Sequence, residues 1–273
     1  MKQSDIRKMV RDNYGAIARQ GSSCCVLGSC CCNSSETNAL SRNIGYSDDD
    51  LKSVPDGANL GLGCGNPVAL ASLKTGETVL DLGSGAGFDC FLAADRVGDT
   101  GAVIGVDMTP EMLERARANA VKAGYKNVEF RMGEIEHLPV ADNSIDVIIA
   151  NCVINLSLDK TQVFREAYRA LHSGGRIMVS DIVLLDKLPE AVMESAAAYI
   201  SCISGASMKD DYIRAIRDAG FKDIEILSET GYALESIVND AFAQAVMHSS
   251  NLPVENSGEI AGSVRSVSIQ AIK

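Results

Sequence analysis

The sequence predicts a doubly wound α/β fold, in which helices cover both faces of a mainly parallel sheet. From Glu77 onward, short apolar segments alternate with segments of helical periodicity. Most of the apolar segments are near-continuous rather than alternating, as expected of parallel strands that are buried on both faces. These strand candidates cover residues 78–82, 102–107, 128–132, 145–150 and 176–181.

A first clear helix between these strands is predicted for residues 110–123. Thr109 is its N-cap, Pro110 stands in its first turn and Gly124 ends it. This order of residues is typical of a helix that connects two parallel strands.

Three more helices follow from periodicity. Residues 160–172 start at Asp159, where Gln162 is placed for a variant of the capping box. Residues 189–204 and 208–219 form two further helical segments.

The ends of the chain have a different character. Residues 4–19 have a helical apolar face, and residues 21–66 read as a loop-rich, cysteine-rich segment that suggests a lid. The segments 223–229 and 264–272 are late strand candidates, and the second alternates strongly enough to close an edge of the sheet. Residues 231–262 read as a helix and a polar loop without an assigned role.

The predicted organisation therefore has three parts. Residues 1–70 form the N-terminal helix and lid, residues 71–185 the nucleotide-binding core, and residues 186–273 a region that covers the substrate and completes the sheet.

Composition limits the possible partners. The chain has 273 residues, of which 46% are hydrophobic and 22% charged, as in a globular protein. Its formal net charge is -11 and it has no tryptophan and no basic patch, which argues against a nucleic-acid substrate. The polar start has no signal-peptide core and no stretch is apolar for long enough to span a bilayer, so we predict a cytoplasmic protein without a membrane partner.

A glycine-rich turn follows the first strand. In VLDLGSGAGFD, Gly83, Gly85 and Gly87 stand between a strand and a helix. Glycine lets the backbone approach a ligand closely, and the N-terminus of the next helix presents free N–H groups. Asp107 ends the second strand, where an acidic side chain can hydrogen-bond a ribose diol. The spacing differs from the G-x-G-x-x-G pattern of dinucleotide sites, and the bland alternative is a simple tight turn.

The segment D-L-G-S-G-A-G resembles motif I of class I S-adenosylmethionine-dependent methyltransferases. GVDMTPEML, MGEIEHLPVADNSIDVIIAN and LHSGGRIMVSD resemble later motifs of that family in the same order, over about residues 75–182. The resemblance implies a seven-stranded Rossmann-like methyltransferase sheet, mostly parallel with an antiparallel last strand, and S-adenosylmethionine as cofactor. A Rossmann sheet that binds another nucleotide remains the alternative.

The same resemblance implies the residues that bind the cofactor. Met108 would flank the adenine, Glu134 and Ile135 would border it, and Asn151 would reach the methionine end. The full set is Asp81, Gly83, Ser84, Gly85, Gly87, Asp107, Met108, Glu134, Ile135 and Asn151.

Nine cysteines are the unusual feature of the composition. Without a signal peptide a disulfide framework is improbable, and the lack of C-x-x-C spacing with only three histidines fits zinc sites poorly. Structural thiols, redox chemistry and a site for a soft, thiophilic element remain open. The cysteines are Cys24, Cys25, Cys30, Cys31, Cys32, Cys64, Cys90, Cys152 and Cys202.

Single cysteines occur in three separate segments. Cys152 follows the fourth strand at the carboxyl edge of the sheet, where α/β proteins bind ligands. Cys202 lies in a predicted helix after the fifth strand, and Cys64 lies between glycines in LGLGCGNP. Each alone reads as a small buried apolar residue. Three thiols without histidine, if they converge, suit a soft ion such as trivalent arsenic.

At this point the resemblance becomes more specific. NCVINLSLDKTQVFREAYRALHSGGRI, SDIVLLDKLPE, VRDNYGAIA and GLGCGNP are similar to segments of arsenite S-adenosylmethionine methyltransferases, over most of residues 9–230. The resemblance implies arsenic detoxification by methylation of arsenite or its thiol conjugates. It implies that Cys64, Cys152 and Cys202 bind As(III), that Cys90 supports the redox part of the cycle, and that a thiol reductant such as thioredoxin resets the enzyme.

As(III) bound by thiolates keeps a lone pair, so it can attack a sulfonium methyl without a general base. Two alternatives stay open at this stage. One is a methyltransferase that acts on carbon or oxygen of another small molecule, such as a quinone. The other is a thiol-rich metal buffer or sensor, in which the N-terminal cysteines are either exchange partners or adventitious thiols.

Overall fold

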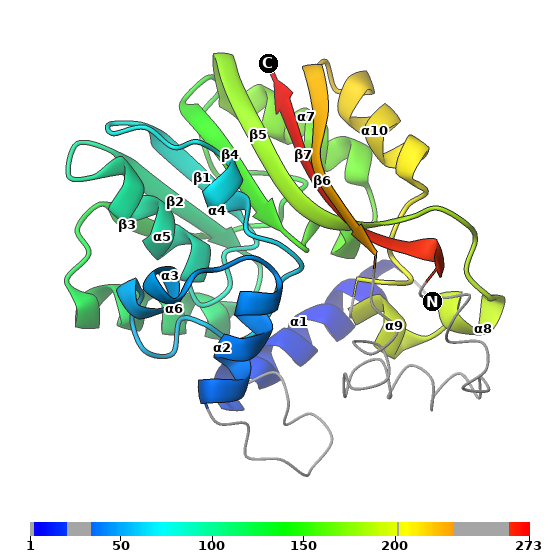
Figure 1. Ribbon diagram of the computed structural model, residues 1–273, viewed down its shortest axis with the longest axis horizontal. Helices are drawn as coiled ribbons and strands as arrows, with labels where there is room; N and C mark the ends of the chain where they lie inside the picture. The colour runs from blue at the N-terminus through cyan, green and yellow to red at the C-terminus, as the bar shows by residue number, and fades with distance from the viewer. Residues whose placement is uncertain (1–2, 21–33, 201, 232–261) are drawn as a thin grey trace.

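The computed structural model describes residues 3–20, 34–200, 202–231 and 262–273 (Figure 1). Five cysteines (Cys24, Cys25, Cys30, Cys31 and Cys32) and almost all of the predicted helix and loop at 231–262 lie outside the described residues. None of the described helices is long and apolar enough to cross a membrane.

A seven-stranded sheet organises the described chain, in the order β3-β2-β1-β4-β5-β7-β6. β7 pairs antiparallel with β5 and β6, while the other neighbours pair in parallel. The doubly wound sheet and its antiparallel last strand are therefore confirmed. The strands are β1 (Thr78–Leu82), β2 (Ala102–Asp107), β3 (Val128–Met132), β4 (Ile145–Asn151), β5 (Leu171–Leu184), β6 (Lys222–Gly231) and β7 (Val264–Ile272).

Helices cover both faces of this sheet (Figure 1). One apolar cluster joins one face to α5 and α6, and a second cluster joins the other face to α7 and α10. Near-continuous apolar strands are thus explained by burial from two sides. The helices are α1 (Gln3–Gln20), α2 (Ser34–Asn43), α3 (Asp48–Ser53), α4 (Pro67–Leu70), α5 (Phe88–Val97), α6 (Pro110–Ala123), α7 (Lys160–Ala170), α8 (Glu190–Met193), α9 (Ala196–Ile200) and α10 (Lys209–Asp218).

Some predicted elements have different bounds in the structure. The predicted helix 189–204 is two short helices, α8 and α9, because the Ser195 hydroxyl accepts a hydrogen bond from Ala198 N and starts a new helix. The segment 21–66 contains α2 and α3 in its described part, where a loop was predicted. α3 begins with a capping box made by Ser47 and Asp50.

The start of α7 corrects a detail of the capping prediction. Asp159 caps the helix by accepting a hydrogen bond from Gln162 N at 2.9 Å. The Gln162 side chain does not return the bond, because its amide donates to the carbonyl of Glu136 at 3.2 Å. The helix also ends at Ala170, since Leu171 is extended and begins β5.

α1 crosses the edge of the sheet where the strands end and packs on α6 (Figure 1). Arg115 of α6 donates to the carbonyls of Ala18 and Gly57, which fixes the end of α1. The Tyr14 hydroxyl donates to the carbonyl of Ile200, so α1 also reaches α9. This N-terminal helix therefore contacts both the core and the later segment that lies over it.

Candidate active site

The glycine turn between β1 and α5 depends on backbone conformation. Gly83, Gly85 and Gly87 have φ of 69°, 52° and 94°, in the left-handed region that favours glycine. A Cβ at Gly83 would lie 2.4 Å from Cγ2 of Val153. No side chain caps the start of α5, so the turn presents backbone N–H groups.

Asp107 faces this turn from the end of β2. One carboxylate oxygen accepts from Gly85 N at 2.9 Å and the other from Thr109 N at 2.8 Å. Burial raises the pKa of Asp107, while these backbone hydrogen bonds oppose the rise. The nearby Ser84 hydroxyl is buried and has no hydrogen-bond partner within the described chain. The turn thus has polar groups available to a ligand.

Cys90 lies in α5, and its thiol donates to the carboxylate of Asp81 at 3.2 Å. Burial, and then the charge of Asp81, raise the pKa of Cys90 well above its usual value. The residue packs in the cluster with α5 and α6, whereas Cys64 and Cys202 pack in another cluster. The structure therefore does not group Cys90 with the three other predicted site cysteines.

Asn151 connects the Cys64 loop to the end of β4. Its side-chain oxygen accepts from Cys64 N at 3.0 Å, and its amide donates to the carbonyl of Gly65 at 2.8 Å. The amide also lies 3.1 Å from Asp89, whose other oxygen accepts from the Tyr46 hydroxyl. Burial raises the pKa of Asp89 to about 6, against the effect of these two donors.

The three residues predicted around the adenine lie at or near the ends of β2 and β3. Met108 is half-buried directly after β2. Glu134 forms an ion pair with Arg7 of α1 at 3.1 Å, and Ile135 is buried in the core. The α1 helix thus contacts the loop that the sequence assigns to the adenine.

Cys64, Cys152 and Cys202 come together at the carboxyl end of β4. Cys152 N donates to the carbonyl of Ser180 at 2.8 Å, which holds its backbone against β5. The Cys202 thiol donates to the carbonyl of Cys152 at 2.9 Å. Hydrogen bonds to the thiols of Cys202 and Cys64, and then burial, raise the pKa of the Cys152 thiol well above its usual value.

Two of these cysteines have an unusual backbone. Cys152 has φ of 55° and Cys202 has φ of 62°, where a side chain costs about 1 kcal/mol relative to glycine. Local propensity does not select cysteine at these two positions, so the thiols themselves are the simplest reason for the residue type.

Asp181 joins the thiols, although the sequence did not single it out. A carboxylate oxygen of Asp181 and the sulfurs of Cys64 and Cys152 all lie within 4.8 Å of one another. Burial raises the pKa of Asp181 to about 6. Asp181 reads as an ordinary strand residue in the sequence, and only the register of β5 beside β4 brings it to the site.

Lys160 and Tyr14 also lie near this cluster and were missed. Burial lowers the pKa of Lys160, while the nearby charges of Asp181 and Cys202 oppose the fall. Burial raises the pKa of Tyr14 well above its usual value, and the charges of Cys202 and Cys152 add to the rise. The only sequence signal for Tyr14 was the VRDNYGAIA segment, and Lys160 gave none beyond its place in a helix.

The sequence is similar to that of known methyltransferases. Residues 73–220 match the family model of a methyltransferase domain. An arsenite methyltransferase of Aquipseudomonas alcaligenes is 37% identical over 247 residues, which cover 88% of this chain and 68% of that protein. The chain belongs to the arsenite methyltransferase family.

Two further members of this family are similar over different lengths. An arsenite methyltransferase of Halobacterium salinarum is 52% identical over 229 residues, or 81% of this chain, yet the match spans only 59% of that protein. A crystal structure of an arsenic (III) S-adenosylmethionine methyltransferase from Chlamydomonas reinhardtii superposes with a TM-score of 0.64 at 33% identity, over 86% of this chain and 73% of that one.

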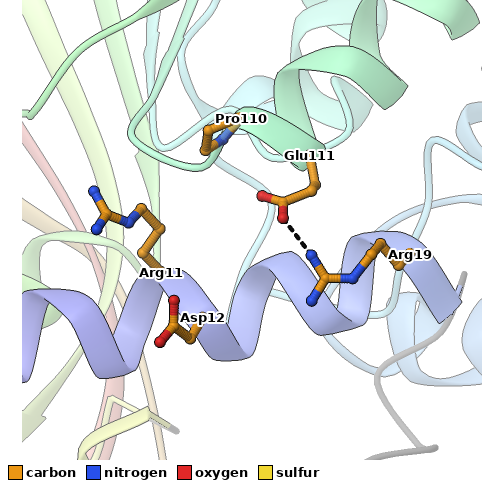
Figure 2. Close-up of a pocket in the computed structure, with 5 residues that line it drawn as sticks. All are labelled: Arg11, Asp12, Arg19, Pro110 and Glu111. Carbon is orange, nitrogen blue, oxygen red and sulfur yellow. Dashed lines mark hydrogen bonds and ion pairs between the residues drawn. The ribbon is translucent and has the colours of Figure 1, made fainter.

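The structure of the present protein also has a charged surface pocket of about 260 Å³ where α1 crosses the start of α6. Figure 2 shows Arg19 of α1 paired with Glu111 of α6, and Arg11 and Asp12 of α1 also line the pocket. None of the predicted site residues lines this pocket, so we attribute its charges to the packing of α1 on α6.

Proposed function

We propose that this protein transfers methyl groups from S-adenosylmethionine to As(III) held by Cys64, Cys152 and Cys202. The observation that carries the proposal is the meeting of three thiols from three separate segments at the carboxyl end of the sheet. The contact between Gly83 and Val153 supports it further, because it puts the glycine turn next to the thiols. The names of the related proteins agree with this reaction.

The residues around the glycine turn fit the cofactor. Left-handed glycines, an uncapped helix start and the unpartnered Ser84 hydroxyl can receive its polar groups, and Asp107 can accept from a ribose diol. When bound, S-adenosylmethionine supplies a methyl group on a positively charged sulfur. We assign Met108, Glu134 and Ile135 to its adenine, and Asp81 and Asn151 to its methionine end.

Arsenite binding needs no separate base. Burial raises the pKa of Cys64, and hydrogen bonds to the Cys202 and Cys64 thiols raise the pKa of Cys152, so both thiols are protonated at neutral pH. Each As–S bond replaces one As–OH bond, and the thiol proton leaves with that hydroxide as water. The arsenic lone pair remains and can attack the methyl carbon in line, so the contribution of the site is to hold the two reactants in position.

Methyl transfer oxidises arsenic to the pentavalent state, and two electrons must be returned before another cycle. We propose that thiols supply them through transient disulfides, with thioredoxin or a small thiol as the final reductant. The thiol of Cys90 is a weaker candidate for this exchange than the site thiols, because it is fully buried in a different apolar cluster and donates to Asp81.

We infer the same three-part organisation that the sequence suggested, with 71–185 as the cofactor-binding core. The hydrogen bond between Tyr14 and Ile200 supports a role of residues 1–70 and 186–273 in covering the substrate.

The test is anaerobic incubation with arsenite, S-adenosylmethionine and excess thiol, followed by mass spectrometric speciation of arsenic. We expect methylated arsenic from the natural protein and none from Cys152→Ser. Equilibrium dialysis should show that both proteins bind S-adenosylmethionine equally well, with Asp218→Asn on the exposed end of α10 as a matched control. Cofactor binding without methylated arsenic from any of the three proteins would refute the proposed substrate.

A further inference from the structure

Asp181 gives the thiol site a ligand that arsenite does not need. Arsenite is satisfied by three thiolates, whereas the cluster of Cys64, Cys152 and Asp181 offers two sulfurs and an oxygen within 4.8 Å of one another. The Cys202 thiol donates to the carbonyl of Cys152, and its sulfur lies outside the group that is within 4.8 Å, so it must turn toward the other ligands to supply a third sulfur. With Cys202 turned in, the set is three sulfurs and one carboxylate oxygen.

These distances fit a tetrahedral metal ion. With bonds of about 2.3 Å to sulfur and about 2.0 Å to oxygen, the ligand atoms of a tetrahedral zinc site lie roughly 3.5 to 3.8 Å apart. The separations among the Cys64, Cys152 and Asp181 atoms, at most 4.8 Å, need to shorten by up to about 1 Å on binding, and the Cys202 sulfur must move closer as well.

Asp181 is oriented before any ion arrives. One of its oxygens accepts from the Asn155 amide and from Ile182 N, each at 2.8 Å. The other accepts from the Tyr212 hydroxyl at 3.0 Å. A carboxylate oxygen can accept more than one partner, so this second oxygen still has capacity for a metal bond. Such outer hydrogen bonds are what positions the ligands of metal sites.

We propose that this site also binds a divalent d¹⁰ cation, such as Zn²⁺ or Cd²⁺, through Cys64, Cys152, Cys202 and Asp181. The bound ion would exclude arsenite, and that consequence alone rests on the proposed function. Such an ion has no lone pair to offer a methyl group, so the complex is an inhibited state of the enzyme. The S–H bonds of the three cysteines break, their protons pass to solvent, and the metal keeps its oxidation state.

The charges around the site agree with a cation. Three thiolates and one carboxylate give four negative charges, and the ion and the nearby Lys160 ammonium offset three of them. Divalent ions of this kind prefer sulfur ligands with a nitrogen or oxygen as the fourth. The two ligand classes therefore differ at Asp181, which the metal uses and arsenite does not.

Cobalt(II) is the probe for the test, because thiolate ligation gives it strong charge-transfer bands and tetrahedral geometry intensifies its visible bands. The full-length chain would first have its other candidate thiols changed to serine, at Cys24, Cys25, Cys30, Cys31 and Cys32. We expect one Co²⁺ per chain with thiolate bands, displaced by one equivalent of Zn²⁺ or Cd²⁺ and also by arsenite. No cofactor or methylation is needed for this readout.

The Asp181→Asn variant distinguishes metal binding from arsenite binding. It should weaken Co²⁺ and Zn²⁺ binding at least about tenfold and change arsenite binding, measured by equilibrium dialysis, by less than about threefold. Asp218→Asn, an exposed carboxylate on α10, is the matched control and should change neither. Circular dichroism confirms that each variant is folded.

Three results would overturn the inference. These are no thiolate bands with Co²⁺, unchanged metal affinity in Asp181→Asn, or simultaneous binding of Zn²⁺ and arsenite. If Asp181→Asn does not fold, cadmium nuclear magnetic resonance of the protein with Asp181 intact tests the role of this residue, because the chemical shift of bound cadmium reports the number of sulfur ligands. We expect three sulfurs, and four would exclude Asp181. Metal binding without arsenic methylation would refute the proposed function and leave the metal site standing.

Discussion

The glycine turn and the thiol site both contain left-handed residues, but of different kinds. In the turn these residues are Gly83, Gly85 and Gly87, for which the conformation is free of strain. In the thiol site they are Cys152 and Cys202, for which it is not. The turn is built from backbone within one short segment, whereas the thiol site is built from side chains of separate segments. The glycine turn therefore has the residue type that its backbone conformation favours, whereas the thiol site has cysteines in a conformation that disfavours them.

The largest effect should come from removing a thiol. Cys202→Ser should lower arsenic methylation about a thousandfold, equivalent to about 4 kcal/mol, because in the proposed site arsenic would lose one of three bonds to sulfur. Its affinity for S-adenosylmethionine should stay within about twofold, since the turn is untouched. Initial rates from arsenic speciation and cofactor dialysis measure the two. A variant that loses the cofactor as well would show that the two regions are not separable in this way.

The turn can be broken by a single methyl group. Gly83→Ala should lower the free energy of unfolding by about 3 kcal/mol, because φ is 69° and the new Cβ would lie 2.4 Å from Val153. Gly124→Ala is the matched control: its φ is 77° and nothing lies within 4 Å of the new Cβ. It should cost only about 1 kcal/mol. Urea unfolding measures both, and equal losses would contradict the role of Val153.

Asp89 connects the two regions through Asn151, and its ionisation should appear in the pH dependence of stability. Its pKa is raised to about 6, so the folded state holds the proton more tightly than the unfolded state. Asp89 should therefore lower the free energy of unfolding as the pH rises through about 4 to 6, by about 1.4 kcal/mol between pH 5 and pH 8, in addition to the loss from Asp181, whose pKa is also raised to about 6. Urea titrations at the two pH values should show this loss in the natural protein.

Asp89→Asn is the control for that dependence, because it keeps the shape of the side chain and removes its charge. The difference between pH 5 and pH 8 should shrink by the same amount in this variant. An unchanged difference would assign the pH dependence to other groups.

The smallest effect concerns the strained cysteine itself. Cys152→Gly should be more stable than Cys152→Ala by about 1 kcal/mol, because only alanine has a Cβ at φ of 55°. Cys64 has no such backbone, so there the alanine variant should be the more stable of the two. Thermal or urea unfolding under reducing conditions gives the comparison. A preference for alanine at both positions would remove the strain argument for Cys152.

The same contrast explains what could be predicted from the sequence. β1, β2 and β3 have the predicted bounds, because apolar runs between turns are a local signal. The glycine turn could be found for the same reason. α2 and α3 were missed since their sequences are polar and have little apolar periodicity, although Ser47 and Asp50 offered a capping signal.

The thiol site could be predicted only in part. Cys64, Cys152 and Cys202 could be named because each stands alone in a separate segment and because these segments resemble those of arsenite methyltransferases. Asp181 and Lys160 could not, because each reads as an ordinary member of a strand or helix. Their place in the site depends on the register of β5 beside β4 and on the packing of α7, which no short segment encodes.

The contact between Gly83 and Val153 has a thermodynamic consequence. Val153 follows Cys152 directly and fills the space that a side chain at Gly83 would occupy, so the glycine turn and the thiol site are in van der Waals contact through one residue. If the methyl donor and arsenite bind at these two places, a single coupling free energy describes how each changes the binding of the other. The factor by which a methyl donor changes the affinity for arsenite must equal the factor by which arsenite changes the affinity for the donor.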